Sequence, residues 1–142
     1  VVRTLRNDAA ASFVFSYECP SPKDIRTLDV GFSLEKDAHL VSVVYSSYTK
    51  EQFPGVQPRG DVRFKIEKLP LAPGMYHIGA RVLANGLEAD QPKGSIGSFE
   101  VLPSENAARS GYQTSPMSVV VFDGCWSQER AEQSFKNLQN LP

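Results

Sequence analysis

The stretch Leu69-Pro-Leu-Ala-Pro-Gly-Met-Tyr-His-Ile-Gly-Ala-Arg-Val82 carries the signals that decide the fold. Its first half contains Pro73-Gly74, which suits the centre of a type II turn because proline presets φ and glycine accepts the positive φ that follows. In its second half, small or polar residues alternate with core-type residues, which are Tyr76, Ile78, Ala80 and Val82. A period of two predicts a strand with one face in a core and the other in solvent.

The same alternation recurs elsewhere along the chain. It is clearest from Leu28 to Leu34, and it returns from Phe13 to Tyr17 and from Val62 to Ile66. Further segments with strand-like composition are Val1 to Arg6, Leu40 to Tyr48, Ser98 to Leu102 and Ser118 to Phe122. The last is nearly continuous in valine and is expected to be a strand buried on both faces.

Turns rich in proline and glycine separate these segments, and no helical crossover lies between consecutive ones. The sheets are therefore expected to be largely antiparallel, because parallel neighbours need connections of about a dozen residues or more. About eight strands of this kind predict an all-β, antiparallel β-sandwich of the jelly-roll or immunoglobulin-like type. The length of 142 residues fits a single domain that covers residues 1–142.

One helical pattern lies near the C-terminal end. Apolar Ala131, Phe135 and Leu138 recur at spacings of four and three within Ser127 to Gln139, which predicts a short amphipathic helix. The stretch from Pro103 to Pro116 has no such pattern. It is expected to be a structureless connection that leads to another sheet or another subunit.

Composition and charge exclude several classes of function. Fifteen Lys and Arg against sixteen Asp and Glu give a net charge of −1, so nucleic acid is not an expected partner. No apolar run approaches the roughly 20 residues needed to cross a bilayer, so a soluble domain is expected. Cys19 and Cys125 are expected to be buried, reduced thiols, while a disulfide between them stays open as an alternative.

The residues offer no catalytic or metal-binding signature, so neither an enzyme nor a cofactor is expected. His39 and His77 are too few and too far apart for a metal cluster. Gly55 and Gly60 have the spacing of a phosphate-binding loop, but Asp61 stands where that loop needs a lysine. No pair among the sixteen acidic residues stands out as the acid and the nucleophile of a glycosidase.

Four segments in a particular order carry a resemblance to a known family. Lys65-Ile-Glu-Lys-Leu69 is followed by Pro-Leu-Ala-Pro-Gly-Met-Tyr76, by Asn85-Gly-Leu-Glu-Ala-Asp90, and by Gly97-Ser-Phe-Glu-Val101. This order resembles the C-terminal domain of Wzt, the ATP-binding subunit of bacterial O-antigen ABC transporters. The segment from Leu28 to Leu34 is compatible with it, so the resemblance covers roughly residues 12 to 102.

The resemblance implies a non-catalytic, jelly-roll-like domain that recognises the non-reducing end of a lipid-linked O-antigen polysaccharide for export. It implies a cytoplasmic place at the inner membrane, within a longer protein whose ATPase domain precedes Val1 and engages the transporter's membrane subunit. Members of the family can form homodimers by exchanging a C-terminal strand, and Ser118 to Phe122 is positioned to do so here. Binding residues vary with the sugar among members, so the resemblance transfers none of them.

Candidate carbohydrate-binding residues follow instead from the chemistry of sugars. Aromatic rings stack on the apolar faces of sugars, and planar polar groups bind their hydroxyls. Outward positions on strands expected to be adjacent present Arg63, Lys65, His77 and Arg81 as one polar sheet face for an oligosaccharide, or for one that carries phosphate groups. The best stacking candidates are Tyr45, Tyr48 and Trp126. The alternative interpretation is an ordinary solvated face together with ordinary core or interface aromatics.

The alternative function is an immunoglobulin-like protein-interaction or adhesion domain. Such a domain would favour a disulfide between Cys19 and Cys125 and a large apolar surface patch. Arg59-Gly60-Asp61 spells the tripeptide of adhesion ligands, but a tripeptide often arises by chance. A polar turn before a strand is the simpler explanation of that motif.

Overall fold

The computed structural model describes residues 3–49, 53, 55–122 and 124–128. The strands in these residues are β1 (Thr4–Arg6), β2 (Ala11–Glu18), β3 (Leu28–Lys36), β4 (His39–Tyr45), β5 (Arg59–Ile66), β6 (Gly74–Ala84), β7 (Leu87–Asp90) and β8 (Gly97–Leu102). The described helices are two 3-10 helices, η1 (Pro22–Asp24) and η2 (Ser46–Thr49), and one α-helix, α1 (Glu105–Ser110).

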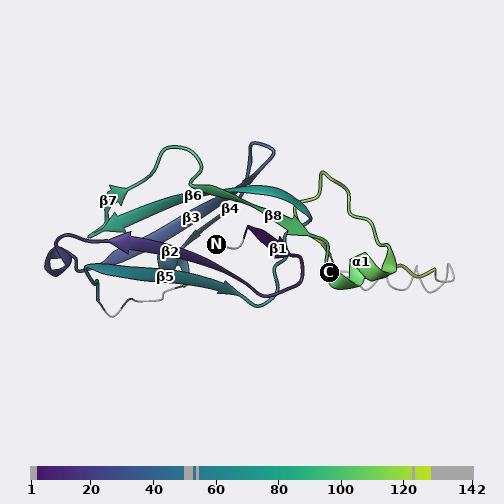
Figure 1. The fold of residues 1–142 in the computed structure, drawn as a ribbon, viewed down its shortest axis with the longest axis horizontal. Coiled ribbons are helices and arrows are strands. Elements are labelled where there is room, and N and C mark those ends of the chain that lie inside the picture. The colour runs from purple at the N-terminus through teal and green to yellow at the C-terminus, as the bar shows by residue number, and fades with distance from the viewer. Residues whose placement is uncertain (1–2, 50–52, 54, 123, 129–142) are drawn as a thin grey trace, which may run out of the picture.

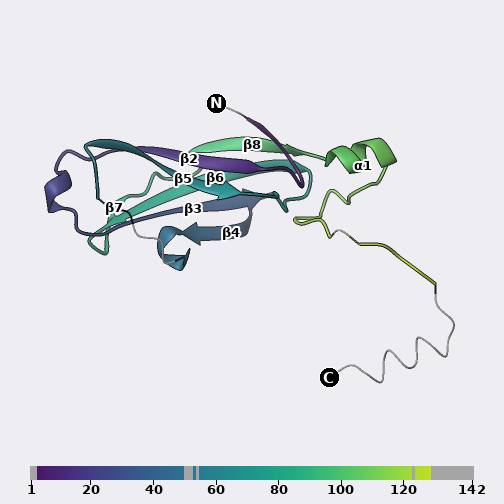
Figure 2. The same ribbon diagram turned by 90° about the horizontal axis from the view of Figure 1, so that it is seen from below.

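The strands form two sheets that pack against each other (Figure 1). The larger sheet has the order β1-β8-β6-β3-β4, with β7 paired to β6, and the smaller sheet consists of β2 and β5. Every pairing is antiparallel except the one between β1 and β8. The predicted all-β sandwich is therefore confirmed. In Figures 1 and 2, η1 and β7 lie at one end of it and α1 lies at the other.

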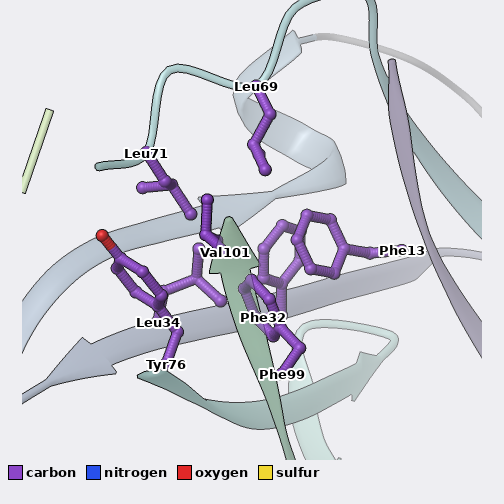
Figure 3. Close-up of a cluster of buried hydrophobic side chains, with 8 residues drawn as sticks. All are labelled: Phe13, Phe32, Leu34, Leu69, Leu71, Tyr76, Phe99 and Val101. Atoms are coloured by element: carbon purple, nitrogen blue, oxygen red, sulfur yellow. The ribbon is translucent and has the colours of Figure 1, made fainter. Parts of the chain in front are cut away.

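The core between the sheets is rich in aromatic rings (Figure 3). The ring centre of Phe13 on β2 lies 5.1 Å from that of Phe32 on β3 and 5.5 Å from that of Phe99 on β8. These contacts join the small sheet to the large one, and burial of each such side chain contributes about 1.5–3 kcal/mol. The other members of the buried cluster are Leu34, Leu69, Leu71, Tyr76 and Val101.

Residues 69–82 form a loop that closes one end of the core and then most of β6. The side-chain amide of Asn7 donates hydrogen bonds of 3.3 and 2.9 Å to the carbonyl oxygens of Leu69 and Leu71, which holds this loop against the sandwich. Tyr76 is fully buried, as the alternation predicts.

The predicted type II turn at Pro73-Gly74 is wrong. Gly74 has a φ of +147°, whereas a type II turn needs a φ of about +80° at its third residue. Gly74 is instead the first residue of β6 and pairs with Val101 on β8. Glycine is still required here, because a Cβ would lie 2.9 Å from Cε of Lys36 and because other residues avoid this φ.

The segment from Ser118 to Phe122 is not the buried strand that its composition predicts. An isolated bridge joins Val120 to Leu71, and Val120 and Phe122 are 45% and 90% exposed. The prediction is wrong because, within the described part of the chain, this segment pairs on one side only and no sheet covers it. Composition predicts that a segment favours an extended conformation, but it does not predict which strands pair with that segment.

The stretch from Pro103 to Pro116 contains the helix α1, so the prediction of a structureless connection is also wrong. The helix begins where the Ser104 hydroxyl accepts a hydrogen bond of 3.1 Å from the Ala107 N–H, and it ends at Gly111 with a φ of +70°. The helix predicted for Ser127 to Gln139 lies outside the described residues, apart from Ser127 and Gln128, which are not helical.

Candidate functional site

The outer face of the large sheet carries a groove over β3, β4 and β6. On β3, Phe32 and Leu34 are buried in the core, so the residues beside them face the opposite way. The outward rows that cross β4, β3 and β6 are Tyr45-Gly31-Arg81, Val43-Ser33-Gly79 and Leu40-Glu35-His77. The groove has a volume of about 350 Å³, and its far wall is the β7–β8 loop, at Gln91, Pro92, Gly94 and Ser95.

Two glycines keep the floor of this groove low. A Cβ at Gly31 would lie 2.4 Å from the ring of Tyr45, and a Cβ at Gly79 would lie 2.6 Å from Oγ of Ser33. Because real side chains do not approach so closely, the Tyr45 ring packs directly on the backbone of β3. Glycine inside a strand often marks such a close approach.

Arg81 is held at one end of the groove by two partners. Its Nε donates to Oε2 of Glu88 at 2.8 Å, and its Nη1 donates to the hydroxyl of Tyr45 at 3.4 Å. The interaction with Tyr45 is the main cause that raises the pKa of Arg81, and Glu88 adds a smaller effect in the same direction, so the side chain stays a cation. The guanidinium is therefore a positioned hydrogen-bond donor.

Asp29 positions the second tyrosine of the site. Its Oδ1 accepts hydrogen bonds from the Ser46 hydroxyl at 2.8 Å and the Ser47 N–H at 3.0 Å, and its Oδ2 accepts one from the Ser47 hydroxyl at 2.7 Å. Burial alone would raise the pKa of Asp29, but these hydrogen bonds lower it below 3.8. They fix η2, which places the Tyr48 ring edge-on against Tyr45 at 5.3 Å.

The structure brings together three of the predicted binding residues, Tyr45, His77 and Arg81, which all line the groove. Tyr48 joins them through its contact with Tyr45 and is 68% exposed. The prediction did not include Glu35, Ser33 or the two floor glycines. The signal for the glycines was present in the sequence, since both occupy outward positions of strongly alternating strands.

The expectation that Arg63 and Lys65 share a sheet face with His77 and Arg81 is wrong. Arg63 and Lys65 lie on β5, which pairs with β2 and not with β6. They are exposed on the outer face of the small sheet, on the opposite side of the sandwich from the groove. Alternation in the sequence predicts that a side chain points outward, but it does not predict to which of the two sheets its strand belongs.

Trp126 lies apart from both faces. Its side chain is fully exposed, and it lies five residues beyond Val121, whose N–H donates to the carbonyl oxygen of Pro70 in the sandwich. Nothing in the described residues places this ring near the groove.

A larger, mainly apolar opening of about 820 Å³ lies between the two sheets at the end that carries η1. It exists because the inward residues of β6 at this end include the small Ala80 and Ala84, which leave space opposite Phe15 and Val62. Aliphatic and aromatic side chains dominate its walls. Sugar hydroxyls need polar partners, so the groove on the outer face is the better candidate for a carbohydrate site.

The motif Arg59-Gly60-Asp61 belongs to strand β5 and not to a turn. Asp61 accepts a hydrogen bond of 2.7 Å from the Ser16 hydroxyl, and Arg59 lies 3.3 Å from a carboxylate oxygen of Glu18. The motif is therefore paired along its length with β2. It is not displayed at a loop tip, as an adhesion ligand requires.

Cys19 and Cys125 are both free, with Cys19 half-buried and Cys125 exposed. The expectation that both thiols are buried is therefore wrong for Cys125. Within the ranges that the structure describes, no cluster of three or more His, Cys, Asp or Glu could hold a metal ion. No helix in those ranges has the length and hydropathy to cross a membrane.

Comparison with known proteins extends the fold assignment. No protein-family model matches the chain, and no curated protein matches it in sequence. Among solved structures, the chain is similar to the crystal structure of the C-terminal domain of Wzt, with a TM-score of 0.59 and 11% sequence identity. The match covers 89% of this chain and 74% of the other. The resemblance noted in the sequence is thus confirmed as a likeness of fold.

Proposed function

We propose that this β-sandwich is a non-catalytic carbohydrate-binding domain and that its ligand lies in the groove over β3, β4 and β6. The observation that carries the proposal is the grouping of Tyr45, Tyr48 and Arg81 around a glycine floor. Stacking rings beside fixed polar donors are what sugar recognition requires. The fold shared with the Wzt domain supports the same conclusion.

Each part of the groove has a role in this proposal. Tyr45 and Tyr48 offer aromatic surface to the apolar face of a sugar ring. Arg81 and Ser33 supply hydrogen-bond donors, and Glu35 supplies acceptors. Arg81 and His77 belong to the first and the last of the outward rows and are four residues apart along β6, a distance of about 13 Å. The groove is therefore long enough for more than one sugar ring.

The ligand that the resemblance favours is the end of a lipid-linked O-antigen polysaccharide destined for export by an ABC transporter. In this role the domain works in the cytoplasm, at the inner membrane, as part of a transporter. It contributes recognition, and the ATPase chemistry belongs to another domain of the full-length protein. This role is supported by the order of motifs from Lys65 to Val101 and by the shared fold.

The domain is further proposed to form a homodimer through its C-terminal segment. After contacting residues 70–72, the chain leaves the sandwich (yellow-green in Figure 2). Met117, just before this contact, and Phe122 and Trp126, after it, are at least 89% exposed, which is costly for large apolar side chains in an isolated chain. Among the described residues, β2 and β5 pair only with each other, so both have an edge on which a strand from a second copy can add.

A protein-interaction domain is the competing function, and the same exposed apolar segment favours it. The two functions differ in what the groove does. In the competing case the groove has no ligand, and the apolar segment binds a protein other than a second copy.

Affinity electrophoresis through gels containing purified bacterial O-polysaccharides, with that of the source strain included, tests the carbohydrate function. We expect saturable retardation by at least one polymer, weakened about tenfold or more by Tyr45→Ala or Arg81→Ala. Arg63→Ala and Lys65→Ala, on the outer face of the small sheet, serve as matched controls and should bind like the parent. Loss of binding in these controls alone would move the site to the other sheet, and no binding to any polymer would reject the function.

A further inference from the structure

We propose that the groove selects an uncharged stretch of glycan and rejects polymers that carry carboxylate or phosphate groups at that position. This inference rests on the proposed carbohydrate-binding function and names the class of ligand that the site takes. It follows from the charges around the groove and from how they are paired.

Arg81, the one arginine among the described residues that line the groove, is not a free cation. Glu88 lies 2.8 Å from Nε of Arg81, so the charge of the guanidinium is offset by an adjacent carboxylate. Two of its five N–H groups are engaged, one by Glu88 and one by Tyr45. The remaining N–H groups suit neutral oxygens such as sugar hydroxyls, whereas an anionic ligand would have to compete with Glu88 for the same cation.

The other end of the groove carries a carboxylate. Glu35 lines the groove beside His77 and is exposed. It takes part in none of the three ion pairs between described residues. A carboxylate accepts hydrogen bonds from vicinal hydroxyls but repels a carboxylate or phosphate that approaches within a few ångströms.

The balance of charge is therefore unfavourable to anions. Of the residues that line the groove, Glu35 and Arg81 carry opposite charges, and Glu88 adds a second negative charge beside Arg81. Lys93 belongs to the loop that forms the far wall, but it is not among the lining residues. No lining lysine or unpaired arginine in the described part of the chain is left to attract an anion. Repulsion between the carboxylates of a site and an anionic ligand mainly weakens the binding of the wrong ligand. Such repulsion is one way in which a site achieves specificity.

A matched pair of polymers tests this directly. The full chain is titrated by calorimetry with the neutral O-polysaccharide that it binds best, and with the same polymer after oxidation of its primary hydroxyls to carboxylates. We expect the oxidised polymer to bind about tenfold or more weakly than its neutral parent. The double variant Glu35→Gln, Glu88→Gln should regain most of the lost affinity for the oxidised polymer, because it removes the repulsion and releases Arg81.

Glu100→Gln is the matched control. Glu100 lies on the same outer sheet face, on β8 beside Met75, and does not line the groove, so this variant should still reject the oxidised polymer. Three results would overturn the inference while leaving carbohydrate binding intact. These are a preference for acidic polymers, equal binding of the oxidised and neutral polymers, or failure of the double variant to regain affinity. Absence of binding to any polymer would instead reject the proposed function, and this inference with it.

Discussion

The ammonium group of Lys36, at the end of β3, donates a hydrogen bond of 2.6 Å to the carbonyl oxygen of Ser118, 82 residues further along the chain. It also donates to the carbonyl oxygen of Pro73 at 3.2 Å and lies 5.5 Å from the centre of the Tyr76 ring. Lys36 is only 7% exposed. A single buried side chain thus joins β3, the start of β6 and the beginning of the C-terminal segment.

Replacement Lys36→Met should loosen this junction while keeping the aliphatic part of the side chain. Loss of the charged hydrogen bonds is expected to lower the free energy of unfolding by about 1–3 kcal/mol. The Val121 amide, which donates to the carbonyl oxygen of Pro70, should exchange its hydrogen faster. Urea unfolding and hydrogen exchange measure both effects. Exposed Lys68→Met is the control, and unchanged exchange at Val121 would contradict the anchoring role.

Gly31→Ala should disturb the groove from below. A Cβ at this position would lie 2.4 Å from the Tyr45 ring, so the ring must move, at a cost of about 1–3 kcal/mol of stability. Glycan affinity should fall together with stability, because Tyr45 is displaced from the floor. Gly97→Ala is a matched control, since a Cβ there meets nothing within 4 Å. Equal melting temperatures for the two variants would disprove the close approach.

The hydrogen bonds to Asp29 predict that folding stability varies with pH in the acid range. The pKa of Asp29 is lowered in the folded state from its ordinary value of 3.8. Its stabilising contribution is therefore present above 3.8 and is lost as the pH falls through the lowered folded value. Because Asp29 is partly exposed to solvent, we expect Asp29→Asn to destabilise by only about 1 kcal/mol near neutral pH. Urea midpoints of parent and variant, measured over a pH series, should converge in acid, and a constant difference would argue against this origin.

The buried hydroxyl of Tyr76 predicts that folding stability also depends on pH in the alkaline range. Its hydroxyl donates to the carbonyl oxygen of Ala72 at 2.7 Å, and burial, with a smaller effect of the Asp37 charge, raises its pKa to about 12. The stabilisation is complete below 10.0, the ordinary value, and is lost as the pH rises through about 12. Spectrophotometric titration should show one phenol ionising near pH 12 that is missing in Tyr76→Phe. If the variant keeps that phase, another tyrosine is responsible.

The alternation from Leu28 to Leu34 and from Tyr76 to Val82 predicted both central strands and the direction of each side chain. This worked because a strand buried on one face needs apolar residues at every second position. The same reasoning failed for Ser118 to Phe122, where the run of valines has no second neighbouring strand among the residues that the structure describes. It also missed β7 (Leu87–Asp90), which is exposed throughout and carries no burial pattern.

The candidate site was predicted in part for the same reason. His77 and Arg81 were predicted because each lies at an outward position of a predicted strand, and Tyr45 was predicted because its ring can stack on a sugar. Arg63 satisfied that rule equally well, yet β5 pairs with β2, whose partner residues lie about 45 positions earlier, as in the contact of Ser16 with Asp61. The local sequence does not reveal such long-range pairing. Only the structure could therefore show which sheet each strand joins.

The close packing of Tyr45 on Gly31 also bears on how such a domain can change its ligand over evolutionary time. Under the proposed function, substitutions in the floor reduce both folding stability and ligand binding, so that part of the groove is expected to change slowly. The far wall is different, because the side chains of Gln91 to Ser95 are exposed and belong to no core cluster. A lineage that meets a new polymer can therefore exchange this loop while the sheet beneath it is inherited unchanged.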